Sequence, residues 1–273
     1  MSRTDPHAQA TPTTDRRAGR GGTEAAEALL ARWLQDRGAR CALFLDVDGS
    51  LLDIAATPDA VVVPVTLRTA LRKLHDELDG ALALVSGRSI EDLDRLFHPL
   101  ALPAAGAHGV EWRQWEGGEL RREPLPRFPD SLRAEMHTLA AAGGGLLLED
   151  KGASVALHYR AAPALGEALG RALTRLLAAP GHDGFRLLPG KMVYEVVGAS
   201  WNKATAIARL LAQPPFAGRR PVFVGDDVTD EPAMAAMPAH GGLGLAVGRE
   251  MSGASAIFDN PAAVRAALGR LTP

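Results

Sequence analysis

Short apolar runs alternate with longer amphipathic segments in the first part of the chain. The runs 42–45, 81–85 and 101–110 have the length and continuous apolar character of buried parallel strands, the last including its exit loop. Apolar residues recur every three or four positions in the segments between them, which predicts helices over 23–36, 64–78 and 90–96. This alternation predicts an α/β fold with a doubly wound parallel sheet and right-handed crossovers.

The pattern changes in the middle of the chain. Two helices are expected there, at 131–142 and 163–178, and four strands, at 146–149, 154–159, 185–188 and 192–197. The order α-β-β-α-β-β predicts an inserted α+β module with antiparallel strands. The parallel pattern then resumes, with helices at 202–211, 230–237 and 261–271 and strands at 221–224 and 243–247. We therefore expect a tail (1–22), a core (23–110 and 198–273) and an inserted module (111–197).

Composition narrows the class of protein. The 273 residues are 47% hydrophobic, and 30 basic residues nearly balance 32 acidic ones, so no charge excess favours nucleic acid or an anionic membrane as partner. The single cysteine, Cys41, cannot form an internal disulfide, which suits a reducing cytoplasm. No apolar stretch approaches the roughly 20 residues of a membrane-spanning helix. The polar segment 1–22 lacks the apolar region of a signal peptide and is predicted to be disordered.

Acidic residues follow the first predicted strand. The strand 42–45 runs into Asp46-Val47-Asp48-Gly49-Ser50, and the carboxyl ends of such strands are where open α/β sheets bind ligands. Asp46 and Asp48 would there be a nucleophile and an acid/base, with a divalent cation between the carboxylates. An Asx-rich turn after a strand has the same residues. The segment alone therefore leaves both interpretations open.

Three further segments have the same character. Ser86-Gly87-Arg88 ends a strand and precedes a helix, so it is either a phosphate-binding loop or a simple turn. Lys203 begins a helix and either neutralises phosphate charge or lies on a solvated surface. The segment Gly225–Glu231 (GDDVTDE) has four acids within six residues at a strand end. Such like charges repel unless a cation or a basic side chain lies among them, which indicates a functional site.

The order of these segments resembles the motif set of the haloacid-dehalogenase-like phosphatases: D-x-D-G-S, a serine at a strand end, a lysine, and G-D-D-x-x-D. Within that superfamily the chain closely resembles the trehalose-6-phosphate phosphatases over about residues 41–248. The segments that carry this resemblance are Gly106–Gly109, Leu148–Gly152, Ser154–Arg160, Gly190–Val196 and Gly225–Glu231. Two positions depart from the family pattern. Ser50 replaces the usual Thr and keeps the hydroxyl, and Ala204 replaces the usual Gly and leaves Lys203 intact.

The resemblance implies an active site as well as a fold. The fold would be a Rossmann-like core of haloacid-dehalogenase type with an αββαββ cap. The activity would be the Mg²⁺-dependent hydrolysis of trehalose 6-phosphate through an aspartyl-phosphate, with Asp46 as nucleophile, Asp48 as acid/base, and Ser86 and Lys203 stabilising the transition state. Mg²⁺ would be held by Asp46, the main-chain carbonyl of Asp48, and Asp226, while Asp227 and Asp230 orient Lys203 or bound water. Substrate contacts are expected from Gly49, Ser50, Gly87, Arg88, His108, Glu149, Lys151, His158, Arg160, Lys191 and Glu195.

Polar and apolar side chains alternate along the strands of the inserted module, which agrees with a polar face that closes over the core site. With a period of two, Lys191, Val193 and Glu195 share one face, while Met192, Tyr194 and Val196 share the other. In the strand 154–160, Ser154, Ala156, His158 and Arg160 likewise share a face. A solvated sheet face would look the same. The charged groups of Glu149, Lys151, Lys191 and Glu195 suit the hydroxyls of a neutral sugar, because each gives a strong directional hydrogen bond.

Three other functions share parts of this pattern. A phosphatase for another sugar phosphate, such as sucrose phosphate or mannosylglycerate phosphate, would keep the core motifs and differ in the inserted module. A non-catalytic sugar-phosphate sensor would need no acid at position 48, and a phosphomutase would have to protect its phosphoenzyme from water. The expected partner is a small sugar phosphate, with neither nucleic acid nor membrane. The resemblance also suggests functional pairing with a separate trehalose-phosphate synthase.

Overall fold

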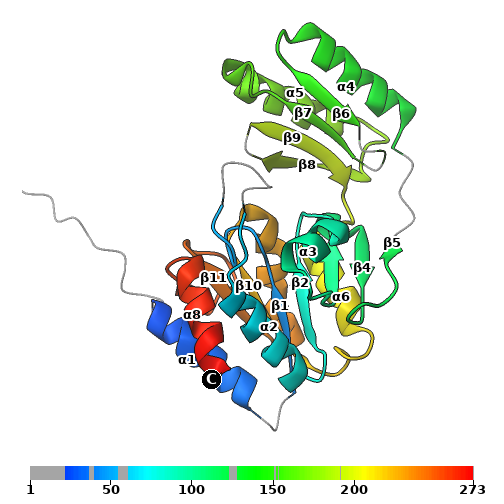
Figure 1. Ribbon diagram of the computed structural model, residues 1–273. Coiled ribbons are helices and arrows are strands. Elements are labelled where there is room, and N and C mark those ends of the chain that lie inside the picture. Colours follow the sequence, from blue (N-terminus) through cyan, green and yellow to red (C-terminus); the bar gives the residue numbers. More distant parts are fainter. Residues whose placement is uncertain are drawn as a thin grey trace, which may run out of the picture.

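The computed structural model describes residues 22–36, 40–54, 61–122, 128–150, 152, 154–190 and 192–272. These residues form a large α/β unit, the core, and a smaller α+β unit above it in Figure 1. We call the smaller unit, residues 128–198, the cap. Most of the predicted tail, residues 1–21, lies outside the described residues.

The core is built on one eight-stranded sheet. Its strands, in spatial order, are β12 (Ala256–Phe258), β11 (Leu243–Val247), β10 (Arg220–Gly225), β1 (Cys41–Leu45), β2 (Leu82–Val85), β3 (Ala104–Gly106), β4 (Glu111–Arg113) and β5 (Arg121–Arg122). The first six strands are mutually parallel, β4 is antiparallel to β3, and β5 is antiparallel to β4. Every residue of β1, β2 and β11 is buried, which explains their continuous apolar sequences.

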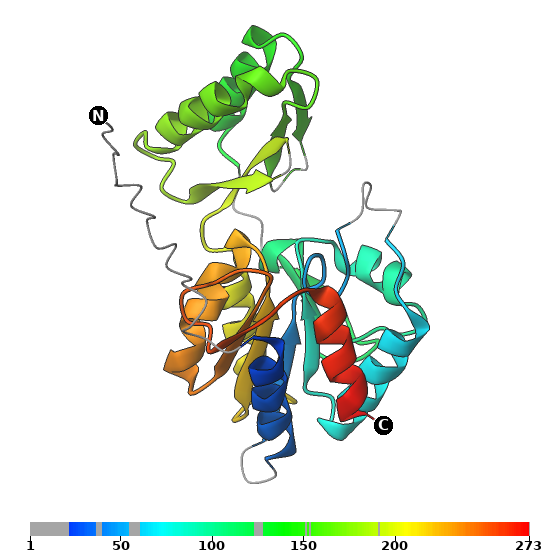
Figure 2. The same ribbon diagram turned by 90° about the vertical axis from the view of Figure 1, so that its left-hand side faces the viewer.

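Helices cover both faces of this sheet, as a doubly wound fold requires. One face carries α1 (Thr23–Gln35), α2 (Val65–Glu77) and α8 (Pro261–Leu271), and α8 packs against both of the others. The opposite face carries α6 (Lys203–Leu211) and α7 (Glu231–Ala236), as Figure 2 shows. Helix α3 (Ile90–Phe97) packs beside β3 and β4 and follows its N-cap, Ser89, whose hydroxyl accepts the N–H of Asp92 at 3.1 Å. The predicted α/β class is confirmed.

The cap has the predicted αββαββ order. It consists of α4 (Asp130–Ala142), β6 (Leu147–Asp150), β7 (Val155–His158), α5 (Gly166–Leu177), β8 (Phe185–Gly190) and β9 (Val193–Gly198), with an antiparallel sheet in the order β6-β7-β9-β8. The two helices lie on the side of the sheet away from the core (Figure 1). The alternate residues Val155, Leu157 and Val196 face the helices and form the cap's own apolar core. The opposite face is directed toward the core.

The expected boundary between residues 110 and 111 lies too early. Strands β4 and β5 pair with β3 and each other, so they extend the core sheet, and the chain leaves the core only after Arg122. The pattern of apolar residues did not predict β4, because this strand carries buried charged side chains. Glu111 accepts the N–H of Ile90 at 2.5 Å, and Arg113 donates to Asp94 and to the carbonyl of Leu102. These bonds satisfy charges that would otherwise make a buried strand unfavourable.

Two smaller differences concern the strands. Strand β12 was not predicted, because three residues are too few to show a period. Strand β8 continues through Pro189 and Gly190, two residues beyond its predicted end at 188. Pro189 is tolerated there because β8 is an edge strand. Among the residues that the structure describes, no helix is long and apolar enough to cross a membrane.

Candidate active site

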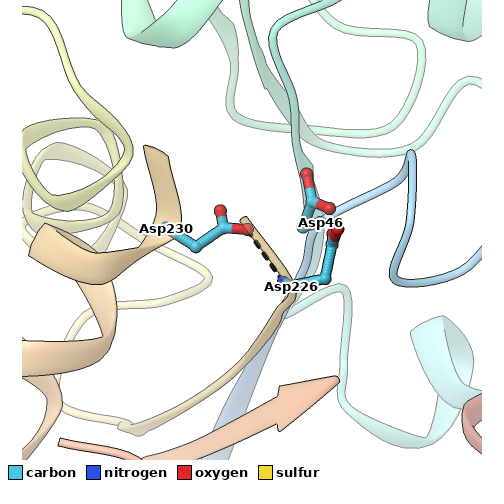
Figure 3. Close-up of side chains that lie close together, drawn as sticks. All are labelled: Asp46, Asp226 and Asp230. Atoms are coloured by element: carbon cyan, nitrogen blue, oxygen red, sulfur yellow. Dashed lines mark hydrogen bonds between the residues drawn. The ribbon is translucent and has the colours of Figure 1, made fainter. Parts of the chain in front are cut away.

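Acidic side chains meet where the order of strands reverses. The chain proceeds from β1 to β2 and β3 on one side, whereas β10 and β11 lie on the other. Asp46 follows β1 and Asp226 follows β10, so both lie at the carboxyl ends of adjacent parallel strands (Figure 3). The N–H of Asp46 donates to the carbonyl of Val224 at 3.0 Å and ties the two strand ends together. Ligands of open α/β sheets bind at such a switch point.

Lys203 lies between two of the carboxylates. It is the first residue of α6, which Asn202 caps through a hydrogen bond from the N–H of Thr205. The Lys203 ammonium donates to Asp46 Oδ1 at 2.6 Å and to Asp230 Oδ1 at 2.5 Å, and the three side chains are at most 5% exposed. Burial alone would lower the pKa of Lys203, but the two carboxylates outweigh it and raise that pKa. Lys203 is therefore a fixed cation.

Asp230 organises the loop after β10. Its Oδ2 accepts the N–H groups of both Asp226 and Asp227 at 3.0 Å, as the dashed line in Figure 3 shows for Asp226. Since its other oxygen accepts from Lys203, Asp230 has no oxygen without a hydrogen bond. Burial raises the pKa of Asp230 to about 6, the Asp46 carboxylate adds to this, and Lys203 opposes it. Asp230 thus positions Lys203 and the loop that carries Asp226.

Asp46 and Asp226 have the donor atoms that a divalent cation needs. Single oxygens of Asp46, Asp226 and Asp230 lie within 4.8 Å of one another. Among the described residues, the buried Oδ2 of Asp46 has no hydrogen-bond partner. Burial raises the pKa of Asp46 to about 6, against the opposing effect of Lys203, and also raises that of Asp226. A hard divalent cation would relieve the repulsion between the carboxylates of Asp46 and Asp226 and would give Oδ2 of Asp46 a partner. The residues present therefore fit such a cation.

The glycine and serine of the first motif lie directly against Asp226. A Cβ on Gly49 would be 2.1 Å from Asp226 Oδ2, and the φ of Gly49 is +89°, so only glycine fits this position. The hydroxyl of Ser50 donates to Asp226 Oδ1 at 2.8 Å. Both residues were expected to contact substrate. In the structure they lie against the carboxylate of Asp226.

Asp48 is held by Arg88. The guanidinium donates to both carboxylate oxygens of Asp48, Nε and Nη2 each at 2.7 Å. Arg88 follows the buried Ser86, whose hydroxyl accepts the N–H of Arg88 at 3.1 Å. This bidentate pair holds Asp48 at the Ser86 loop, in the cleft that Asp46 also lines, in a position that the motif spacing alone did not reveal.

His108 closes the site beside the Ser86 loop. A Cβ on Gly87 would lie 2.7 Å from the ring of His108, so the glycine allows the imidazole to approach the loop. His108 has a φ of +57° within the 3₁₀ helix Ala107–Gly109, and its N–H donates to the Ser86 carbonyl at 3.2 Å. This unusual backbone aims the ring into the same cleft as Ser86.

The cleft between the two units has a volume of about 750 Å³. From the core it is lined by Asp46, Asp48, Ser86, Gly87, Arg88, His108, Lys203, Asp226 and Asp227, among others. From the cap it is lined by Leu188, Pro189, Gly190, Val193 and Glu195. Residues predicted from distant segments therefore meet in one cavity, whose size falls within the roughly 300–1,000 Å³ of small-molecule sites.

The charged cap residues predicted from the sequence lie in different places. Glu195 faces the cleft and accepts the hydroxyl of Ser154 at 2.5 Å. Glu149 and His158 pair with each other at 3.0 Å and do not line the cleft, and Arg160 is exposed. Lys151 and Lys191 lie outside the described residues.

Sequence reasoning missed the apolar cap residues of the cleft, of which Leu188 is an example. Leu188 pairs directly with Glu195 in the β8–β9 register and so shares its face. The register of the two strands was the signal that could have identified it.

The fold places the protein in a structural class. Its parallel sheet carries an aspartate at the switch point, a second acid two residues later, a buried lysine and an acidic loop. A phosphatase of the haloacid-dehalogenase superfamily from Bacteroides thetaiotaomicron shares this fold, with a TM-score of 0.63 at 19% identity, covering 87% of this chain and 97% of that one. The C-terminal domain of Candida albicans trehalose-6-phosphate phosphatase shares this fold, with a TM-score of 0.72 at 22% identity, covering 90% of this chain and 96% of that one.

Sequence comparison gives the family. The trehalose-phosphatase family model matches residues 44–257. A probable trehalose-phosphate phosphatase of Sinorhizobium fredii is 44% identical over 222 residues, covering 81% of this chain and 83% of the relative. The trehalose-6-phosphate phosphatase of Escherichia coli K12 is 39% identical over 221 residues, covering 80% and 81%. The chain belongs to the trehalose-phosphatase family and is a phosphoric monoester hydrolase.

Proposed function

We propose that this enzyme hydrolyses trehalose 6-phosphate to trehalose and inorganic phosphate, with Asp46 as the nucleophile. The observation that carries the proposal is the state of the Asp46 carboxylate. One oxygen is fixed by Lys203 at 2.6 Å, and the other is buried without a partner among the described residues. Asp46 also lines the cleft, so its carboxylate is available to a phosphoryl group bound there, and the names of the relatives supply the substrate.

The reaction divides into two displacements. In the first, an Asp46 oxygen attacks phosphorus, the bond from phosphorus to the sugar oxygen breaks, and Asp48 gives its proton to that oxygen. In the second, Asp48 takes a proton from water, whose oxygen attacks phosphorus and releases phosphate from Asp46. Lys203 and the hydroxyl of Ser86 stabilise the charge on the phosphoryl oxygens in both steps, because both groups are fixed in a buried site.

We propose Mg²⁺ as the cation of this site. The carboxylates of Asp46 and Asp226 and the main-chain carbonyl of Asp48 offer the hard oxygen ligands that Mg²⁺ prefers. When bound, Mg²⁺ supplies positive charge that offsets the repulsion between the Asp46 carboxylate and the phosphate dianion. Gly49 and Ser50 keep Asp226 in place for this role, through close approach and a 2.8 Å hydrogen bond.

A phosphate-release assay over a panel of sugar phosphates tests this function. We expect the purified chain to hydrolyse trehalose 6-phosphate well ahead of sucrose 6-phosphate, mannosylglycerate phosphate and glucose 6-phosphate. Chelation of divalent cations should abolish release, and added Mg²⁺ should restore it. Preference for another disaccharide phosphate would assign that sugar phosphate as the substrate. Binding without turnover would indicate a sensor. Conversion of glucose 1-phosphate to glucose 6-phosphate would indicate a mutase.

Glu195 is the cap residue best placed to select the sugar. Replacing Glu195 by Gln keeps its shape and removes the charge that strengthens its hydrogen bonds to hydroxyls. Because a hydrogen bond to a charged group contributes about 1.5–3 kcal/mol, kcat/KM for trehalose 6-phosphate should fall roughly 10- to 100-fold, mainly through KM. Turnover of p-nitrophenyl phosphate, which has no sugar, should change little.

The matched control is Glu167→Gln, on the exposed side of α5, where the carboxylate pairs with Arg171. That variant should behave as wild type with both substrates. Equal losses of Glu195→Gln on trehalose 6-phosphate and p-nitrophenyl phosphate would show that Glu195 acts on the core chemistry and not on the sugar.

A further inference from the structure

The segment that joins the cap to α6 is held from both sides. It runs from Gly198, the last residue of β9, to Asn202, the N-cap of α6. The carbonyl of Ser200 accepts the hydroxyl of Thr205, a core residue, at 2.8 Å. The next carbonyl, that of Trp201, accepts Nη2 of Arg186, a cap residue, at 2.7 Å. Consecutive carbonyls are thus bound by the two different units.

Packing makes this segment stiff. The indole of Trp201 is 4% exposed and lies against Gly198, where an added Cβ would be 3.0 Å from the ring. The N–H of Ala199 donates to the carbonyl of Gly184, just before β8, at 2.7 Å. A movement of β8 would therefore be passed to Trp201 and would not be absorbed by a loose loop.

Arg186 is an unusual residue for this place. It lies on β8, on the strand face of Leu188, whose side chain lines the cleft, and opposite the face of Leu187, which packs into the cap core. Among the described residues, its buried Nε has no hydrogen-bond partner, and burial lowers the pKa of the guanidinium. A half-buried cation whose Nε–H is buried without a partner is costly, so its position calls for an explanation other than stability.

We propose that Arg186 is a positioning residue that couples the orientation of the cap to Lys203. The coupling path is short: Arg186 holds the carbonyl of Trp201, Asn202 follows, and Lys203 begins α6 with its ammonium 2.6 Å from Asp46. Cap movement then reaches the ammonium that fixes the nucleophile, so that Lys203 is best placed only when the cap is correctly seated. This inference rests on the proposed function, because it assigns Lys203 to the same reaction.

The test replaces Arg186 by Met, which keeps the length of the stem and removes every donor. Kinetics are measured with trehalose 6-phosphate and with p-nitrophenyl phosphate, which makes no sugar contacts in the cap. Because small misplacements of catalytic groups are costly, we expect kcat to fall on the order of tenfold or more with both substrates. KM for p-nitrophenyl phosphate should stay near that of wild type, and Arg186→Lys, which retains a donor, should recover part of kcat.

The control is Arg175→Met, on the exposed surface of α5, which should leave both substrates unaffected. Unchanged kcat on p-nitrophenyl phosphate would overturn the coupling, even if KM for trehalose 6-phosphate rose. Should the Met variant fail to fold, Arg186→Gln, with a polar but shorter side chain, carries the same expectation. A wild-type chain that hydrolyses p-nitrophenyl phosphate and not trehalose 6-phosphate would refute the proposed function and still leave the coupling testable.

Discussion

Replacing Asp46 by Asn is expected to lower metal-dependent phosphate release by on the order of 10⁴-fold or more. The amide has the shape of the carboxylate but no charge, so it neither attacks phosphorus nor binds a hard cation well. The loss should appear in kcat with trehalose 6-phosphate and with p-nitrophenyl phosphate alike. Acid quenching of the wild-type reaction, followed by mass spectrometry, should find phosphate on the peptide that contains Asp46, and the variant should show none.

Loss of structure must be separated from loss of chemistry in this variant. Because burial raises the pKa of Asp46 to about 6, the folded state holds the neutral form more readily than the unfolded state does. The melting temperature of the metal-free Asn variant should therefore not fall below that of the wild type at pH 8. Asp76→Asn, at an exposed site on α2, is the matched control and should retain full activity. Substantial turnover by Asp46→Asn, in protein free of contaminating phosphatase, would rule out Asp46 as the nucleophile.

The core fold could be predicted because its central parallel strands are buried on both faces. A strand such as β1 has no solvated side, so its sequence is a continuous apolar run that stands out between amphipathic helices. Strand β4 could not be predicted, since Glu111 and Arg113 are buried only because Ile90, Asp94 and Leu102 satisfy them. Those partners come from other elements, and no local pattern contains them.

The site shows the same limit. The motifs at Asp46, Ser86, Lys203 and Asp226 could be identified because each follows a strand or begins a helix, and parallel strands bring their ends together. The side-chain contacts that these motifs make could not be predicted. The pairing of Asp48 with Arg88 depends on side-chain conformation between segments 40 residues apart. In the cap, the polar and apolar faces of the strands were predicted correctly. The position of the cap over the core decides which residues of the polar face line the cleft, and the sequence pattern does not contain that position.

Lys203→Met is expected to have the second large effect, on both activity and stability. Activity should fall on the order of 10²–10³-fold, the usual loss when one fixed donor to a developing anion is removed. The substitution also leaves Asp46 and Asp230 buried without their shared cation, since the ammonium lies 2.6 and 2.5 Å from their oxygens. Removing one partner of a buried ion pair costs about 3–5 kcal/mol, so the free energy of unfolding of the metal-free protein should fall by about that amount at pH 8.

The pH dependence of that loss identifies its cause. Burial raises the pKa of both Asp46 and Asp230 to about 6 even with Lys203 present, and without the ammonium both pKa values should rise further. A carboxyl group with a raised folded-state pKa favours folding below its unfolded pKa, and this contribution is lost as the pH rises through the folded pKa. The destabilisation measured by urea unfolding should therefore be small at pH 5 and grow toward pH 8. Lys73→Met, on α2 and bonded to the carbonyl of Thr272, is the matched control without such a trend. A pH-independent loss of stability in Lys203→Met would mean that lost packing of the lysine stem, and not two uncompensated carboxylates, weakens the fold.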